Sequence, residues 1–332
     1  MKTIMSNKVD LYSLFCELRD KGQNNDNYFV SSISDCVPHK LGCSPEGFPI
    51  FFIECYNKEN TSDIKLKLFS VLFNRQCSIS DINEEVSSTK YYSLIQLNST
   101  NIEFVRYFLE VIYLILCKID KVPNNATLKN EIIKVVKLFT TPTTISKDTV
   151  KGLWAELFVI DQSSDPNYLI KAWHSSLEDK YDFNDGIDKI EVKSTSGSKR
   201  EHTFSIEQLT PNENSNLLVA SVFVLQSGMG KNVFNLLDDI QARITDIESQ
   251  IKIKEQVLQT IGPHIDEVTN LYFDYPYACQ LYGLFDYKDV PSIDATSIPP
   301  LVSSVHFRSD LSAIDSADLN TYDSQLFKNL KP

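Results

Sequence analysis

The sequence has few cysteines, which can crosslink a chain, and few glycines and prolines, which interrupt helices and strands. Its 332 residues include 7 cysteines, 10 glycines and 13 prolines. An odd number of cysteines with no CxxC pair does not suit a disulfide framework. No apolar leader follows Met1, and the most apolar run, 104–119, is too short for a bilayer-spanning helix and is interrupted by Arg106, Glu110 and Lys118. We therefore expect a cytoplasmic protein with no membrane segment.

Basic residues are scarce in the second half of the chain. Residues 1–145 carry 16 Lys+Arg and 16 Asp+Glu, whereas residues 146–332 carry 16 Lys+Arg and 28 Asp+Glu, so the whole net charge of −12 lies in the second half. Proteins that bind nucleic acids unaided usually show a basic surface, because phosphate neutralisation supplies much of their affinity. Any nucleic-acid function must therefore rely on a divalent cation, a dimer cleft or a partner protein.

The length and the hydrophobic content of 42% indicate two globular domains. A Pro/Thr segment without periodicity, 140–146, separates them. We expect an N-terminal α+β domain at 1–145, used for assembly or for positioning a substrate, and a second domain at 146–332. The overall class is α/β, or α+β over the whole chain, with a mixed central sheet flanked by helices.

The periodicity of apolar residues predicts the main elements of both domains. Strands are expected at 48–55, 65–72, 91–97, 180–183, 189–194 and 217–226, and helices at 102–119, 128–139, 149–160 and 233–261. The turn Asn184-Asp185-Gly186 joins two of these strands as a hairpin. The long helix 233–261 either packs on its own domain or pairs with a second copy in a homodimer.

The segment IEVKST, 190–195, carries the clearest chemical signal. In a strand, Glu191 and Lys193 share one face. Asp182, on the preceding strand of the hairpin, is expected within a few ångströms of Glu191. Two carboxylates so close repel each other unless a proton or a cation lies between them, and oxygen ligands suit Mg²⁺ or Mn²⁺. A lysine beside such an ion can stabilise charge on a phosphoryl oxygen.

A third acid is expected from the helix that packs against the hairpin. Glu156, in GLWAEL, lies at the edge of the apolar stripe of helix 149–160, so its carboxylate can reach the rim of the buried face.

Other motifs in the sequence give weaker indications of function. SGMGKN, 227–232, lacks the spacing of a P-loop, and the five histidines show no zinc-ligand spacing.

The order of a helix Glu, a strand Asp and Glu-x-Lys resembles the PD-(D/E)XK nuclease superfamily. GLWAELFVI, the Ala172-Trp173 segment, KYDF, EVKST and SIEQL are similar in particular to a PD-(D/E)XK group found among restriction-modification and phage-defence genes. The resemblance implies a restriction-endonuclease-like core in which Asp182 and Glu191 bind the metal, Lys193 is the catalytic lysine and Glu156 is an accessory acid. One departure is Tyr181, which stands where the motif has proline.

Several neighbouring residues keep two interpretations. Gln208 belongs either to the site or to a capping box with Ser205. Lys199 and Arg200, after the active strand, either contact a phosphate backbone or lie in a solvated loop. Asp185 and Asp188 could replace Asp182 as ligand, although their place beside Gly186 suits a turn better.

The resemblance implies a Mg²⁺- or Mn²⁺-dependent DNA endonuclease of a bacterial restriction-modification or anti-phage defence system. Its expected partners are DNA and a helicase, ATPase or methyltransferase that helps to hold the DNA, and the isolated protein is expected to bind DNA weakly. The alternative is an inactive nuclease-fold scaffold or assembly subunit of a defence complex. A nuclease specific for RNA is a third possibility.

Overall fold

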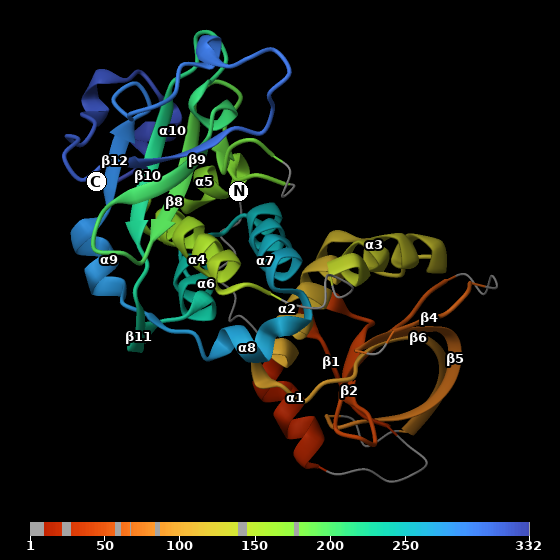
Figure 1. Cartoon of the computed structure of the whole chain (residues 1–332). Helices are drawn as coiled ribbons and strands as arrows, with labels where there is room; N and C mark the ends of the chain where they lie inside the picture. The colour runs from red at the N-terminus through yellow and green to blue at the C-terminus, as the bar shows by residue number, and fades with distance from the viewer. Residues whose placement is uncertain are drawn as a thin grey trace. The chain divides into compact units, whose positions relative to one another are not determined.

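The computed structural model describes residues 10–21, 28–56, 61–66, 68–83, 87–138, 145–175 and 179–331. The chain divides into two compact units, Met1–Thr141 and Pro142–Pro332 (Figure 1). Most of the Pro/Thr segment at which the sequence places a boundary lies outside the described residues. No described helix has the length and apolar content needed to cross a membrane.

The first unit is built on a sheet that closes on itself. Its strands are β1 (Tyr28–Ser32), β2 (Lys40–Cys43), β3 (Pro49–Ile53), β4 (Ile64–Lys65), β5 (Phe69–Asp81) and β6 (Ser87–Leu97), in the order β1-β2-β3-β6-β5-β4. β1 pairs antiparallel with β2 and also parallel with β5, which closes the ring of five strands and leaves β4 beside β5. Apolar residues that include Val30, Phe52 and Tyr92 form one core cluster of this unit.

Three helices belong to the same unit: α1 (Leu11–Asp20), α2 (Ile102–Lys118) and α3 (Asn125–Leu138). α2 packs through Phe108, whose ring contacts those of Phe51 on β3 and Phe69 on β5 at 5.7 and 5.9 Å between centroids. The single strand expected at 65–72 is wrong. The chain turns there, with the amide of Leu66 bonded to the carbonyl of Phe69, so this run supplies the ends of the two antiparallel strands β4 and β5.

The second unit contains a mixed four-stranded sheet. Its strands are β7 (Phe183–Asn184), β8 (Lys189–Thr195), β10 (Leu217–Phe223) and β12 (Gly283–Asp286), in the order β12-β10-β8-β7. β8 and β10 are parallel, whereas β7 and β12 are antiparallel to their neighbours. A separate ladder joins β9 (Glu201–Ser205) to β13 (His306–Asp310), and β11 spans Gln226–Lys231. This mixed sheet with helices confirms the predicted fold class.

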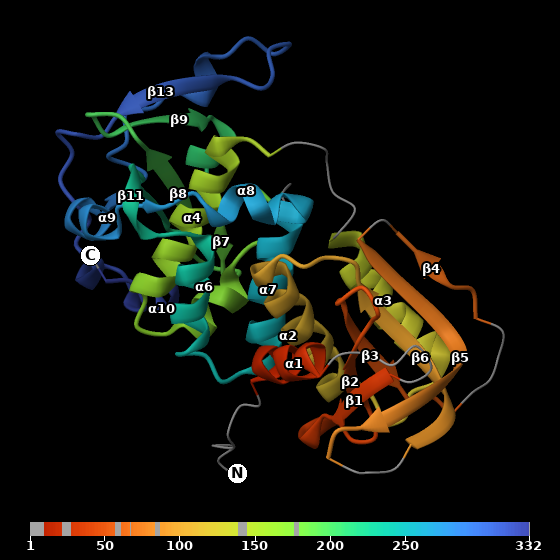
Figure 2. The ribbon, with the colours of Figure 1, turned by 90° about the horizontal axis from the view of Figure 1, so that it is seen from below.

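The helices of the second unit are α4 (Lys147–Gln162), α5 (Pro166–Ala172), α6 (Val233–Gln241), α7 (Ile247–Ile261), α8 (Ile265–Thr269), α9 (Tyr275–Leu281) and α10 (Gln325–Lys328). Ser146 is the N-cap of α4, and its side chain accepts a hydrogen bond from the amide of Thr149. It lies against β8, and its Trp154 is fully buried and donates to the carbonyl of Lys231 at 3.0 Å. The ladder of β9 and β13 packs on the sheet through Phe204 and Val219 (Figure 2).

The single long helix predicted for 233–261 is wrong. The chain forms α6 and α7 instead, separated by residues 242–246. Asp246 caps α7 by accepting from the amide of Ser249 at 3.2 Å, which starts a new helix rather than continuing the old one. The guanidinium of Arg243 donates to the carbonyls of Asp161 and Ser163, so the connection is tied to the end of α4. The apolar period continues across the break because both helices bury apolar residues in the same unit.

Removing the cap of α7 should destabilise this unit moderately. We expect Asp246→Ala to lower the free energy of unfolding by about 1 kcal/mol, since an N-cap acceptor is lost. Asp246→Asn is the control, because its side-chain oxygen can still accept from the amide of Ser249. Urea denaturation followed by circular dichroism measures both variants, and equal losses in the two would contradict a capping role.

Candidate active site

Asp182 lies at the edge of β8. Its carboxylate accepts a hydrogen bond of 2.6 Å from the backbone amide of Val192, and its carbonyl accepts one of 2.8 Å from the amide of His174. These two bonds place Asp182 between Val192, the neighbour of Glu191 on β8, and the segment that follows α5. The sequence predicts a strand from residue 180, whereas the short strand β7 begins only at Phe183. Asp182 therefore lies just before the hairpin of β7 and β8.

Glu191 and Lys193 interact directly on β8. The Lys193 ammonium is 2.7 Å from Oε1 of Glu191, and only 3% of Glu191 is exposed to solvent. Gln208 completes this group: its Nε2 donates to the same Glu191 oxygen at 2.5 Å and its Oε1 accepts from Lys193 at 3.0 Å. The ammonium is thereby held in a fixed position.

Gln208 contacts Glu191 and Lys193 and also bonds back to Ser205. Its Oε1 also accepts from the amide of Ser205 at 3.1 Å, and its own amide donates to the Ser205 hydroxyl at 3.3 Å. These reciprocal bonds have the pattern of a capping box, and they close the turn that leads into the short 3₁₀ helix Glu207–Leu209. The box aims the Gln208 amide group at Glu191 and Lys193, so a local turn motif orients a residue of the candidate site.

Glu156 reaches the group from α4. Its Oε2 accepts from the indole nitrogen of Trp173 at 2.7 Å and lies 3.0 Å from Nε2 of His174. Trp173 and His174 follow the end of α5, and the Trp173 backbone pairs with Phe183 beside Asp182. Glu156 from α4, and Trp173 and His174 after the end of α5, are therefore held next to the hairpin of β7 and β8.

The electrostatics of the site favour a cation. Burial and the nearby negative charges of Glu191 and Glu156 raise the pKa of Asp182 well above its ordinary value. Burial also raises the pKa of Glu191, although the ammonium of Lys193 opposes that shift. Such clustered carboxyl groups carry a cost at neutral pH that a proton or a metal ion relieves.

The residues present fit a divalent ion. Glu156, His174 and Asp182 each offer one ligand atom, and these atoms all lie within 4.8 Å of one another. Two carboxylates and one imidazole suit Mn²⁺ and related ions, and the carboxylates suit Mg²⁺. The structure thus adds His174 to the residues predicted from the sequence. His174 joins this group only in the folded chain, since Glu156, His174 and Asp182 lie on three separate segments without a recognisable spacing.

Asp185 and Asp188, which the sequence leaves open as alternative ligands, form hydrogen bonds elsewhere. Asp185 accepts from the amides of Ile187 and Asp188 at 3.0 and 2.8 Å, as a turn residue does. Asp188 is buried and accepts from both the backbone and the side-chain nitrogen of Asn216. Neither carboxylate is directed to the candidate site. Their bonds support the turn interpretation.

Arg200 is bonded within the fold, a setting that matches neither the phosphate contact nor the solvated loop that the sequence leaves open. Its guanidinium donates to the carbonyls of Ser221 and Leu281 at 3.2 and 2.6 Å, and it lies over the rings of Phe223 and Phe285. With a further bond to the Ser221 hydroxyl at 2.7 Å, three of the five guanidinium N–H groups are bonded within the fold, so Arg200 ties the start of β9 to the sheet. Its neighbour Lys199 differs, because 65% of the Lys199 side chain is exposed.

His202 should make the stability of this unit depend on pH. Burial, with the cations of Arg200 and Lys193, lowers the pKa of His202 to about 4, whereas the unfolded chain protonates near 6.5. Stability is therefore full above pH 6.5 and is lost as pH falls from 6.5 toward 4. We expect about 2 kcal/mol of this loss by pH 5.

The measurement is denaturant unfolding at pH 7 and pH 5 for the wild type, for His202→Asn and for the control His306→Asn, a substitution of an exposed histidine on β13. The acids near β8 titrate in all three proteins, so the difference between variants isolates His202. The same loss between pH 7 and pH 5 in His202→Asn as in the wild type would refute the prediction.

The chain was compared with known proteins. The family described as "Putative PD-(D/E)XK family member, (DUF4420)" matches residues 15–312 of the 332-residue chain. This match covers most of both structural units and every residue of the candidate site. No curated protein and no solved structure gives a significant match.

Proposed function

The chain belongs to this PD-(D/E)XK family, and we propose that it is a divalent-metal-dependent DNA endonuclease of a bacterial restriction-modification or anti-phage defence system. The observation that carries the proposal is the position of Lys193. Its ammonium is fixed by Glu191 and Gln208, within the group of residues that includes Asp182. An ammonium and several carboxylates are the side chains that hydrolysis of a phosphodiester requires.

Each residue has a role that follows from its bonds. In our proposal Asp182 and Glu156 hold the ion, with His174 as a further ligand, and Glu191 lies beside them. The ion, when bound, lowers the pKa of a water molecule and polarises the phosphate. Lys193 stabilises negative charge on a phosphoryl oxygen, and Gln208 positions Lys193. Trp173 orients Glu156 through the bond from its indole nitrogen.

The net charge makes partners part of the proposal. The second unit is acidic, so phosphate contacts on the isolated protein are few and its binding to DNA should be weak. We propose that a second copy of the chain, or a helicase, ATPase or methyltransferase, supplies further contacts. The first unit is the part we assign to assembly or to positioning the substrate.

Nicking of supercoiled plasmid tests the proposal. Purified protein should nick DNA with Mg²⁺ or Mn²⁺ and not with EDTA, and an excess of RNA should not compete. Glu191→Ala and Lys193→Ala, purified in the same way, identify a contaminant if they retain the activity. The protein is assayed alone and together with the proteins that its neighbouring genes encode. If it nicks DNA with neither metal in both cases, the result favours the scaffold alternative.

A further inference from the structure

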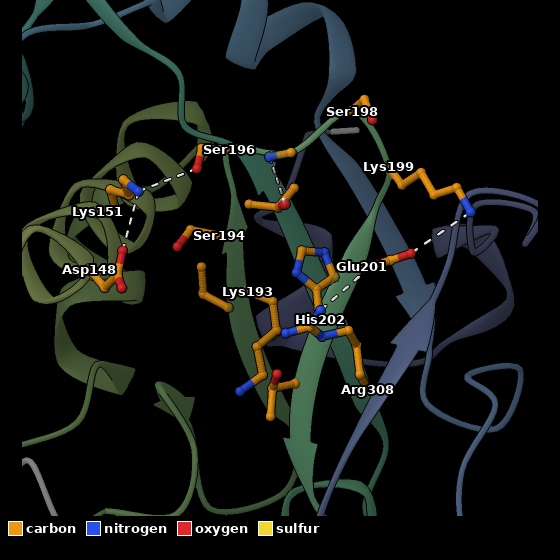
Figure 3. Close-up of a pocket in the computed structure, with 15 residues that line it drawn as sticks. Asp148, Lys151, Lys193, Ser194, Ser196, Ser198, Lys199, Glu201, His202 and Arg308 are labelled. Carbon is orange, nitrogen blue, oxygen red and sulfur yellow. Dashed lines mark hydrogen bonds and ion pairs between the residues drawn. The ribbon is translucent and has the colours of Figure 1, made fainter.

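The second unit has a pocket of about 640 Å³ that adjoins the candidate site (Figure 3). Its floor comes from Val192–Thr195 of β8 and 201–203 of β9, and the loop 196–199 forms its rim. Lys193 belongs to this lining and also bonds Glu191. The pocket and the acidic group are therefore continuous through one side chain, and a chain of phosphates at Lys193 could extend into the pocket.

Cations outnumber acids in the lining. It includes four basic side chains, Lys151, Lys193, Lys199 and Arg308, and two acidic ones, Asp148 and Glu201. The residues 146–332 that supply the whole lining carry 28 acids and 16 bases, so this excess of positive charge is local. Serine and threonine hydroxyls at 194–196, 198 and 203 add neutral hydrogen-bond donors.

Two of the cations are available to a ligand. The side chains of Lys199 and Arg308 are 65% and 71% exposed. Both form long, exposed ion pairs: Lys199 lies 3.8 Å from Glu201 and 3.5 Å from Asp310, and Arg308 lies 3.9 Å from Glu201. Exposed ion pairs of this kind contribute little to stability, so a phosphate can replace the carboxylates at small cost.

Lys151 has a different part. Its ammonium is 3.2 Å from Asp148 and donates to the Ser196 hydroxyl at 3.3 Å, and only 21% of its side chain is exposed. This bridge links the first turns of α4 to the rim loop. Lys151 is thus a positioning residue that shapes the pocket, whereas Lys199 and Arg308 present exposed side chains to it.

We propose that this pocket binds a phosphate group of the nucleic-acid strand next to the phosphodiester at Lys193, and that Lys199 and Arg308 exchange their acidic neighbours for it. The inference rests on the proposed function, because it takes a nucleic acid as the ligand. It also supplies phosphate contacts that the acidic net charge of the unit does not suggest.

DNA binding with Ca²⁺ in place of Mg²⁺ tests the pocket without cleavage. The test variant is Lys199→Ala with Arg308→Ala, and the matched control is Lys171→Ala with Lys328→Ala. The control side chains are 63% and 55% exposed and lie 3.4 and 2.9 Å from acids, but neither lines the pocket. Fluorescence anisotropy with a labelled duplex, repeated over a range of salt concentrations, gives the affinity and the salt slope.

The pocket variant should lose at least about tenfold in affinity, and its salt slope should shrink by about 1 to 2, because each phosphate contact contributes roughly 0.9 on duplex DNA. The control should change neither quantity comparably. A second measurement replaces single phosphates of the duplex by neutral methylphosphonates. One position should weaken wild-type binding and have no further effect on the pocket variant.

The outcomes separate the pocket from the nuclease. Equal affinity and slope for the pocket variant and the control would overturn the inference, even if the wild type cuts DNA with Mg²⁺. Weakened binding of the pocket variant, together with a wild type that binds but does not cut, would support the pocket and reject the nuclease. A wild type that does not bind DNA in Ca²⁺ would also overturn the inference. Both variants alter exposed side chains, and a thermal melt verifies that they fold.

Discussion

Asp182→Asn should reduce metal-dependent cleavage of DNA by roughly 10³-fold, the scale on which loss of one charge-stabilising group in an active site acts. Asp182 lies in the middle of the site: with Glu156 and His174 it belongs to the group of side chains that fits a divalent ion, and it interacts electrostatically with Glu191. The asparagine keeps the size of the side chain and an oxygen that can accept from the amide of Val192. The loss would therefore report the missing charge and not a collapsed hairpin.

Asp185→Asn is the matched control for this substitution. Asp185 lies three residues away in the turn, and its bonds to two backbone amides need only an oxygen acceptor. Plasmid nicking rates in Mg²⁺ and Mn²⁺ should be close to wild type for this variant. If Asp182→Asn cuts as well as Asp185→Asn, then Asp182 does not hold the catalytic ion.

Mn²⁺ should stabilise the folded protein and act through the same residues. A ligand present at 100 times its dissociation constant adds about 2.7 kcal/mol to the free energy of unfolding. We expect Asp182→Asn to abolish this gain, because the variant loses a charged ligand. Scanning calorimetry with and without Mn²⁺ measures the effect, and the electron paramagnetic resonance signal of bound Mn²⁺ reports binding independently of activity.

Without metal, the order of stability should reverse. The pKa of Asp182 is raised in the folded protein, so its charged form opposes folding at pH 7. In EDTA, Asp182→Asn should therefore unfold at a higher temperature than the wild type, by a gain of roughly 1 kcal/mol. A lower unfolding temperature would show that the carboxylate is not under repulsion.

His174→Ala decides which residues hold the ion. If Glu156, His174 and Asp182 form the ligand set, this variant should lose most of the stabilisation by Mn²⁺. If Asp182 and Glu191 hold the ion, as the sequence predicts, the stabilisation should persist in His174→Ala and disappear in Glu191→Gln. The stabilisation by Mn²⁺ cannot both disappear and persist in His174→Ala, so this measurement decides between the two ligand sets.

The local geometry of the site follows from short sequence signals. The alternation of a strand places Glu191 and Lys193 on one face, and the structure joins them at 2.7 Å. The helix stripe places Glu156 at the edge of the buried face of α4, where it meets Trp173. These relations depend on the geometry of one element at a time, and the sequence shows them directly.

Other features depend on contacts between distant segments. Arg200 resembles a basic loop residue in the sequence, yet it is bonded to carbonyls on β10 and at the end of α9. The break between α6 and α7 follows from the cap at Asp246 and from Arg243, which bonds the end of α4. Periodicity does not detect either feature, because the apolar spacing is the same with and without the break.

The amino-acid sequence by itself determined the family, the mixed α/β class and the identity of the acids and the lysine on and around β8, because these depend on residue type and on spacing within one strand or one helix. Only the tertiary structure decided that His174 joins Glu156 and Asp182, that Gln208 holds Lys193, and that the lining of one pocket is basic within an acidic unit. The physical reason is that hydrogen bonds and charges act over a few ångströms in space. Folding brings within that range segments that lie 165 residues apart, such as Ser164, whose hydroxyl donates to the carbonyl of Asn329 at 3.3 Å.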